Sequence, residues 1–332
     1  MVAARDHEKG KSVTKMKKVK TTTEETVLKK KVRSAESEAE TRKTKEERGD
    51  TSILDKRATH GLWALTNREL KKWYKAPILL FMTLIQPVIW LGLFGKAMDF
   101  GNLFAGGGTG LSLPASAVDQ FMKATFGTTD YFSFLSVGML SFIVLFTAMF
   151  SGMSIVWDRR FGFLNKILST PVARGTIVMG KVFSSVIRSL TQAAIVLVIA
   201  VLLGMNTANM TILGILGTFA SLFLLAQGMS ALFLMLALRS TDWQSQMAIM
   251  NLLNLPLLFA SNALFPASFM PHWLQYIVKV NPISYATDIG RQMLLGSTGM
   301  ASLGFDFAFM VGFAVLFSSV GIVMSWKLLS KQ

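Results

Sequence analysis

The sequence contains no cysteine, which excludes disulfide bonds and thiolate metal sites from its 332 residues. Charge is also scarce, because only 16% of the residues are Asp, Glu, Lys or Arg, whereas 52% are hydrophobic and the mean hydropathy is +0.46. An ordinary soluble domain has about 25% charged residues. The composition therefore indicates an integral membrane protein.

Acidic residues and histidine are missing from the uncharged runs that could cross a bilayer. Ion-coupled carriers normally need such a group inside the membrane to hold a proton or cation. The nearest catalytic pattern, GxxxxGK at 175–181, has Val182 where a phosphate loop needs Ser or Thr, and no soluble strand precedes it. The three histidines form no metal pattern. We therefore expect a non-catalytic chain that binds no metal and no cofactor of its own.

The first 57 residues differ from the rest, with 17 Lys and Arg against 11 Asp and Glu and few large apolar residues. Such a stretch buries too little apolar surface to fold, so residues 1–57 are predicted to form a disordered cytoplasmic tail. Its lysine clusters could instead be attracted to anionic lipid or to an acidic partner. Nucleic acid is disfavoured because no aromatic residues interrupt the charges.

Residues 58–332 are predicted to form an all-α transmembrane domain with six spans of roughly 20 residues. The prolines at 266 and 271 interrupt the run after the fifth span, so this part is expected to lie shallow as an external re-entrant segment. The expected spans cover about 76–95, 131–157, 182–204, 211–238, 243–265 and 307–326.

The basic residues outside the tail predict the orientation of these spans. Twelve of them lie before the first span, between the second and third, between the fourth and fifth, or after the sixth, and four lie on the other side. By the positive-inside rule, both termini of this multi-pass protein are expected in the cytoplasm, in the cell membrane.

The segment before the first span, 60–77, is amphipathic and is expected to lie in the cytoplasmic interface of the membrane. It would be either a simple anchor or a relay of motion to the first span. Its candidate functional residues are Arg68, Glu69, Lys72 and Trp73.

A second amphipathic segment, 157–175, lies between the second and third spans. Its basic residues predict a cytoplasmic position, and its apolar residues recur at roughly helical spacing. A membrane protein that exposes such a helix to the cytosol is expected to offer it to a partner.

The third span carries a polar stripe at three- and four-residue steps, toward its cytoplasmic end. The stripe could face a water-filled vestibule, or its cations could extend to the membrane surface. Its members are Lys181, Ser185, Arg188 and Gln192.

Three stretches together resemble the membrane subunits of type-2 ABC transporters, the group that includes daunorubicin-resistance-like drug exporters. The first is 158–164 (DRRFGFL), with 170–174 (TPVAR) and Gly180-Lys181 after it. The second is 68–70 (REL), followed by Pro77 and Pro87, and the third is 255–291, which contains NPISY at 281–285. The resemblance covers about residues 59–332.

This resemblance implies a half-permease of six spans that pairs with a second permease copy, as a homodimer, and docks a separate ABC ATPase subunit. ATP and Mg would then be bound by the partner. The resemblance assigns ATPase coupling to Asp158, Arg159, Arg160, Phe161, Gly162, Phe163, Leu164, Lys166, Leu168, Pro171 and Arg174.

The expected function is export of a hydrophobic or amphipathic substrate, drug-like or lipid. A permease for polysaccharide or lipid conjugates has the same architecture. An ATP-independent secondary carrier or a non-transporting scaffold are alternatives from other classes, and the missing intramembrane acid disfavours the carrier.

Overall fold

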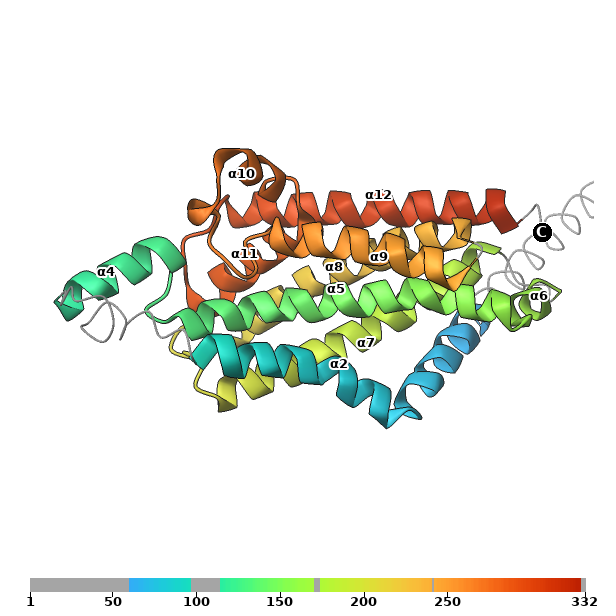
Figure 1. Cartoon of the computed structure of the whole chain (residues 1–332), viewed down its shortest axis with the longest axis horizontal. Helices are drawn as coiled ribbons and strands as arrows, with labels where there is room; N and C mark the ends of the chain where they lie inside the picture. The colour runs from blue at the N-terminus through green and yellow to red at the C-terminus, as the bar shows by residue number, and fades with distance from the viewer. Residues whose placement is uncertain (1–59, 97–113, 170–173, 241, 330–332) are drawn as a thin grey trace, which may run out of the picture. The chain divides into compact units, whose positions relative to one another are not determined.

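The computed structural model describes residues 60–96, 114–169, 174–240 and 242–329. Within these ranges the chain is all-helical, without a strand (Figure 1). The expected tail, 1–57, and Pro171 lie outside the described residues. A first helix covers residues 60–74. The elements after it are α2 (Pro77–Trp90), η1 (Leu91–Gly95), α4 (Ala115–Phe126), α5 (Tyr131–Arg160), α6 (Phe163–Leu168), α7 (Arg174–Leu202), α8 (Ile212–Arg239), α9 (Trp243–Phe259), η3 (Ala267–Phe269), α10 (His272–Val278), α11 (Pro282–Leu295) and α12 (Leu303–Leu329).

Four described helices are long and apolar enough to cross a membrane, namely α5, α7, α8 and α12. They correspond to the second, third, fourth and sixth expected spans. The first expected span is a shorter apolar helix, in which α2 continues into the π-helical turn η1. The fifth corresponds to α9, which has 17 residues. The described chain therefore shows four spans by length and composition, and not the full count of six.

The helices extend beyond the uncharged runs that the sequence shows. Helix α5 continues through Asp158 to Arg160, α7 begins at Arg174, and α12 begins at Leu303. An uncharged run marks only the apolar part of a helix, and a charged residue can continue the helix where it finds a partner. Consequently Asp158, Lys181 and Asp306 are helical residues.

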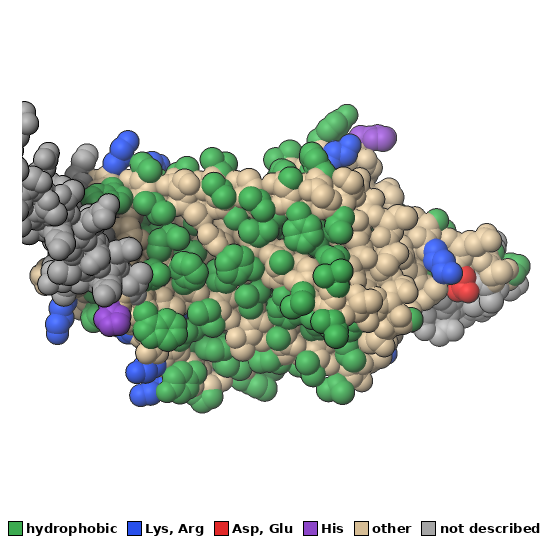
Figure 2. All heavy atoms as spheres, turned by 180° about the vertical axis from the view of Figure 1, so that it is seen from behind, with side chains coloured by type: hydrophobic (Ala, Val, Ile, Leu, Met, Phe, Trp, Pro, Cys, Tyr) green, Lys and Arg blue, Asp and Glu red, His purple; other side chains and the backbone are tan. Residues whose placement is uncertain are grey.

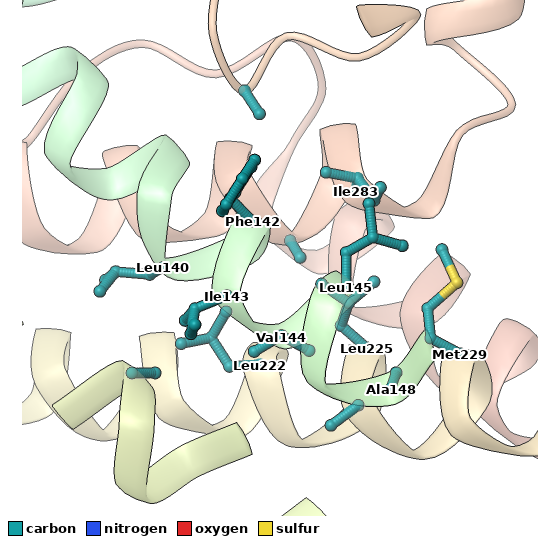
Figure 3. Packing of buried hydrophobic residues seen from close by; sticks show 14 of the residues in the cluster. Leu140, Phe142, Ile143, Val144, Leu145, Ala148, Leu222, Leu225, Met229 and Ile283 are labelled. Carbon is teal, nitrogen blue, oxygen red and sulfur yellow. The ribbon is translucent and has the colours of Figure 1, made fainter. Parts of the chain in front are cut away.

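Helix α5 forms the centre of the bundle, and 94% of its most apolar window is buried. It packs against α7, α8, α9 and α11, while α8 also packs against α12. Figure 3 shows Phe142 and Leu145 of α5 in the same cluster as Leu225 of α8 and Ile283 of α11. By contrast, the corresponding window of α12 is 22% buried, so α12 lies on the outside of the bundle.

Figure 2 shows the face behind that of Figure 1, where hydrophobic side chains cover the middle and the Lys and Arg side chains lie toward the two ends. Such a band is typical of a surface in contact with hydrocarbon. Large apolar side chains that are exposed on the bundle as a whole include Phe81, Val198, Leu216 and Val315.

The segment after α9 folds back onto the bundle. Pro256 lies inside α9, and the side chain of Asn281 donates hydrogen bonds to the carbonyls of Leu257 (2.7 Å) and Ala260 (2.8 Å) at the end of that helix. Asn281 also caps α11 by accepting from the backbone N–H of Ile283. Helix α11 is then buried against α5 and α8.

Candidate functional site

The junction between α5 and α6 forms one end of the bundle, together with the 60–74 helix and the first turns of α7 (Figure 1). We call this the coupling end, and the end at the start of α5, near Tyr131, the distal end. Gly162 makes the turn from α5 into α6, with a φ of 69°. That left-handed backbone conformation is open to glycine at little cost. Local sequence therefore allows α6 to leave α5 at a sharp angle.

Aromatic side chains are exposed beside this turn. Phe161 is 71% exposed and Trp157 is 39% exposed, and their rings stack at 5.6 Å between centroids. The side chains of Arg160 and Lys166 are also exposed, whereas Leu164 and Ile167 face the bundle and are buried. Helix α6 is thus fixed by its apolar face. An exposed aromatic pair flanked by two cations remains available for a soluble partner.

Beneath this surface, two carboxylates and a lysine are buried together. Lys181 on α7 donates to Asp158 of α5 at 2.5 Å and to Glu69 of the 60–74 helix at 3.3 Å. A third hydrogen bond joins the Lys181 ammonium to the Ser154 hydroxyl at 3.0 Å. One side chain therefore ties together three helices.

Two further cations lie on the solvent-facing side of this group. Arg68 and Lys72 each contact both carboxylates, at distances between 3.1 and 3.3 Å. The guanidinium of Arg68 also stacks on the ring of Phe163, 3.3 Å from its centroid. We call these five ionised residues, Arg68, Glu69, Lys72, Asp158 and Lys181, the ion network. Through Phe163 the network also contacts α6.

The charges of the network hold both acids ionised. Burial by itself raises the pKa of the Glu69 carboxyl, but attraction to Lys181 and Lys72 outweighs burial, so this pKa lies below the ordinary glutamate value. Paired buried charges tolerate the loss of one member poorly, because the others are left buried without compensation. The network therefore acts as a rigid connection between helices.

Arg159 was expected to contact a partner, but its guanidinium is directed into the bundle. It donates to the carbonyls of Ser240 (2.7 Å) and Leu238 (3.2 Å), at the C-terminal end of α8. A cation at the C-terminus of a helix satisfies carbonyls that have no partner within the helix. Arg159 thus joins the end of α5 to the end of α8.

The polar stripe on α7 consists mainly of contacts between helices. Lys181 belongs to the ion network, and the Ser185 hydroxyl accepts from Ser230 of α8 at 2.7 Å. Gln192 accepts from Thr147 of α5 at 2.5 Å and donates to Thr83 of α2 at 2.7 Å. Polar contacts of this kind join helices within membranes. The vestibule prediction remains open only for Arg188, whose Nε bonds the Ser184 carbonyl while a buried Nη has no partner among the described residues.

Some expected site residues are only partly described. Trp73 lies on the 60–74 helix and is half-buried, while the backbones of Leu168 and Arg174 stand at the ends of α6 and α7. Residues 175–181, which follow the GxxxxGK pattern, form the first turns of α7 and do not link a strand to a helix.

Sequence reasoning named all five members of the ion network but did not predict their association. Glu69, Asp158 and Lys181 come from three separate segments, and Lys181 is 112 residues from Glu69 along the chain. Sequence reasoning also missed Ser154, a serine inside an apolar span. The available signal was charge balance, because Asp158 and Glu69 are acids among basic residues at the same predicted membrane side.

The fold defines a multi-pass helical membrane protein. At its coupling end the short helix α6 lies beside exposed aromatic and basic residues that are open to a soluble partner. The chain matches the ABC-2 type transporter family over residues 60–295, which include the 60–74 helix, the ion network and α11. It therefore belongs to that family and is a membrane permease subunit of an ABC exporter. Membership implies an ABC ATPase as partner.

Named relatives agree with this assignment. The chain is 30% identical over 282 residues to the transport permease ycf38 of Cyanophora paradoxa, covering 81% of this chain and 88% of the relative. It is 25% identical over 191 residues to the daunorubicin resistance ABC transporter permease protein DrrB1 of Streptomyces coeruleorubidus, covering 58% and 67%. To the probable multidrug ABC transporter permease YbhR of Escherichia coli K12 it is 28% identical over 170 residues, covering 50% and 45%.

Proposed function

We propose that two copies of this chain form a homodimer that exports a hydrophobic or amphipathic substrate, drug-like or lipid, across the cytoplasmic membrane. The ATPase subunit binds ATP and Mg, and the permease itself binds no cofactor and catalyses no reaction. The names of DrrB1 and YbhR, which mention drug resistance and multidrug transport, support a drug-like substrate. The basic residues of the coupling end support a cytoplasmic position for it and for both termini.

The observation that carries the docking proposal is the exposed pair Trp157 and Phe161, placed directly at the α5–α6 turn with Arg160 and Lys166 beside it. A force applied to α6 reaches α5 through the chain. It also reaches the 60–74 helix and α7, through Phe163 and the ion network. Nucleotide-driven closure of the ATPase would therefore tilt α5 and α7 together, and the dimer cavity would open on the distal side.

The exposed face of the 60–74 helix supports its placement at the lipid headgroups. Trp63 is 63% exposed and Tyr74 is 59% exposed, and both share this helix with the exposed cations Lys71 and Lys75. Aromatic and basic side chains together favour the interfacial layer of a membrane. Lipid is thus proposed as a contact of this helix.

Substitution of the exposed aromatic residue tests docking. We expect Phe161→Asp and Arg160→Glu to abolish co-purification of the ABC ATPase subunit and to abolish ATP-dependent transport in proteoliposomes. Membrane insertion and the unfolding temperature should stay near wild type, because both side chains are exposed.

Matched controls lie at the distal end, where Phe269→Asp and Lys279→Glu make the same chemical changes at exposed positions. These controls should keep the ATPase bound. Normal complex formation by Phe161→Asp would contradict the docking proposal. Transport that continues without ATP would contradict the exporter mechanism.

A further inference from the structure

Two carboxylates are buried together at the distal end, where α11 meets α12. Asp288 is 4% exposed and Asp306 is 0% exposed. Both carboxyl groups lie within reach of one side chain, that of Gln292. The amide nitrogen of Gln292 lies 3.3 Å from Asp288 Oδ2 and 2.9 Å from Asp306 Oδ2. Asp306 is in the first turn of α12, before the edge expected from the sequence.

No ion pair neutralises these acids within the described chain, where the six ion pairs all belong to the ion network. Arg291 is their nearest cation, but its guanidinium donates to the carbonyls of Asn262 (2.7 Å), Ala263 (3.0 Å) and Phe134 (3.2 Å). It also stacks on the Phe134 ring, at 3.4 Å from the centroid. Arg291 therefore fastens the turn after α9 to α5.

Other titratable groups near the acids are the phenols of Tyr285, on α11, and of Tyr131, on α5 beside Arg291. The charged residues of α5 and α7 and the single charged residue of α8, Arg239, lie toward the coupling end of those helices. The Lys123 side chain of α4 lines a nearby cavity. Arg291 thus provides one positive charge near the two acids without an ion pair to either, which leaves the pair one counter-charge short among the described residues.

The placement of two buried carboxyl groups beside one amide nitrogen favours a proton shared between them. Two carboxylates are both acceptors, so a bond between them forms only when one of them is protonated. A second negative charge in this buried place would be strongly disfavoured. Asp306 Oδ1 is buried and has no partner among the described residues, so the ionised form of Asp306 would be poorly solvated.

The connection between α11 and α12, residues 296–302, is attached to this pair. The backbone N–H of Met300 donates to Asp288 Oδ2 at 2.7 Å, and Gln292 donates to the Ala301 carbonyl at 3.4 Å. A Cβ atom on Gly299 would lie 2.0 Å from Gln292 Nε2 and 2.9 Å from Asp288 Oδ2. A side chain at this position would therefore displace the Gln292 amide from the two acids.

We propose that Asp288 and Asp306 form a proton-binding site, and that one shared proton fastens the 296–302 connection to the bundle. The ligand is a proton taken from water, which leaves a hydrogen-bonded monoanion whose charge is held by Met300 N–H and Gln292. Loss of the proton creates two adjacent carboxylates, which repel each other and release the connection.

The same connection borders a cavity at the distal end. This cavity has a volume of about 310 Å³, and Gly296, Ser297 and Thr298 line it together with Lys123 and Asn209. Protonation of the acid pair therefore controls whether residues 296–298, which form one wall of the cavity, are held against the bundle. Because the folded arrangement favours the protonated pair, this fastening is present at low pH and is lost as the pH rises.

Hydrogen exchange of the full chain in lipid nanodiscs tests the site without reference to transport or orientation. After correction for intrinsic exchange, we expect wild-type amides in 296–302 to lose protection by about tenfold per pH unit once the pair begins to ionise. In Asp306→Asn, whose amide stays neutral and can donate a hydrogen bond, the protection should no longer depend on pH. Asp242→Asn, an exposed helix-capping acid, is the matched control and should behave as wild type.

Infrared spectroscopy of the wild-type protein gives a second readout that does not depend on the folding of a variant. A protonated carboxyl band should be present in mildly acidic buffer and should disappear in alkaline buffer. The absence of this band, or an unchanged pH dependence in Asp306→Asn, would overturn the proposal. Protection that Na⁺ or Ca²⁺ restores at high pH would also overturn it, because the pair would then bind a metal cation.

Discussion

At the residue scale, buried carboxyl groups occur at both ends of the bundle, and their negative charge is compensated in different ways. At the coupling end three cations surround Glu69 and Asp158, so both acids are compensated. At the distal end Asp288 and Asp306 have each other and a set of neutral donors. Compensation by fixed cations gives a permanent connection, whereas a shared proton gives a reversible one.

Replacement of the central cation tests the strength of the permanent connection. We expect Lys181→Met to lower the free energy of unfolding by about 3–5 kcal/mol, because Glu69 and Asp158 would stay buried with less compensation. Thermal or denaturant unfolding of the detergent-purified protein measures this loss. Lys166→Met removes an exposed lysine at the same end and should change stability by less than about 0.5 kcal/mol. Equal effects of both substitutions would show that the network contributes little.

Sequence patterns predicted the residues of the coupling end better than their contacts. Arg68, Glu69 and Lys72 follow from an amphipathic pattern, and Asp158 from a basic segment between apolar runs. The spacing of Lys181, Ser185 and Arg188 predicts a polar stripe on one helix face, directed either to a vestibule or to the membrane surface. Helical periodicity places residues on a face of one helix, but it does not say which other helix covers that face.

At the element scale, the turn between α5 and α6 determines where the proposed docking surface lies. Phe161 ends α5, Gly162 adopts a left-handed conformation, and α6 begins at Phe163. The N–H of Gly162 bonds to the Arg159 carbonyl at 3.0 Å, which closes the turn. The direction of α6 thus depends on one backbone conformation.

A β-branched residue at this position should misdirect α6. Gly162→Val places a Cβ at positive φ, which costs roughly 1–2 kcal/mol or more for such side chains. We expect ATPase co-purification to fall at least tenfold, while the unfolding temperature falls by only a few degrees, because the strain is confined to the backbone of the turn and the position has open space around it. Gly312→Val, at an equally open position within α12 with ordinary helical φ, is the matched control. Full ATPase binding by Gly162→Val would show that the turn does not set the docking surface.

The apolar runs located the four long helices, with the ends of α5 and α8 within three residues of expectation. The starts of α7 and α12 were placed too late, because charged residues were treated as limits of a span. The prolines correctly indicated an interruption after α9, but not that α11 would be buried against α5 and α8. Burial of α11 depends on Arg291 and Asn281, whose partners lie in other segments.

At the scale of the whole molecule, the charge distribution predicts the orientation. The chain has no cysteine, so a single introduced cysteine is the one thiol in the protein that a maleimide can label. We expect Lys279→Cys at the distal end to react with an impermeant maleimide in intact cells. Lys166→Cys at the coupling end should react only after the membrane is permeabilised. The opposite labelling would place α6 outside the cell and contradict ATPase docking there.

The sequence by itself determined the class of this protein, because hydropathy and helical periodicity are read within one stretch of sequence and do not depend on which segments pack together. It also determined the exposed basic and aromatic residues near Gly162, since a polar segment between apolar runs cannot be buried in lipid. Only the tertiary structure decided which charges meet. The association of Lys181 with Glu69 and Asp158, and of Asp288 with Asp306, arises from the packing of separate helices, where burial makes each charge depend on its partner.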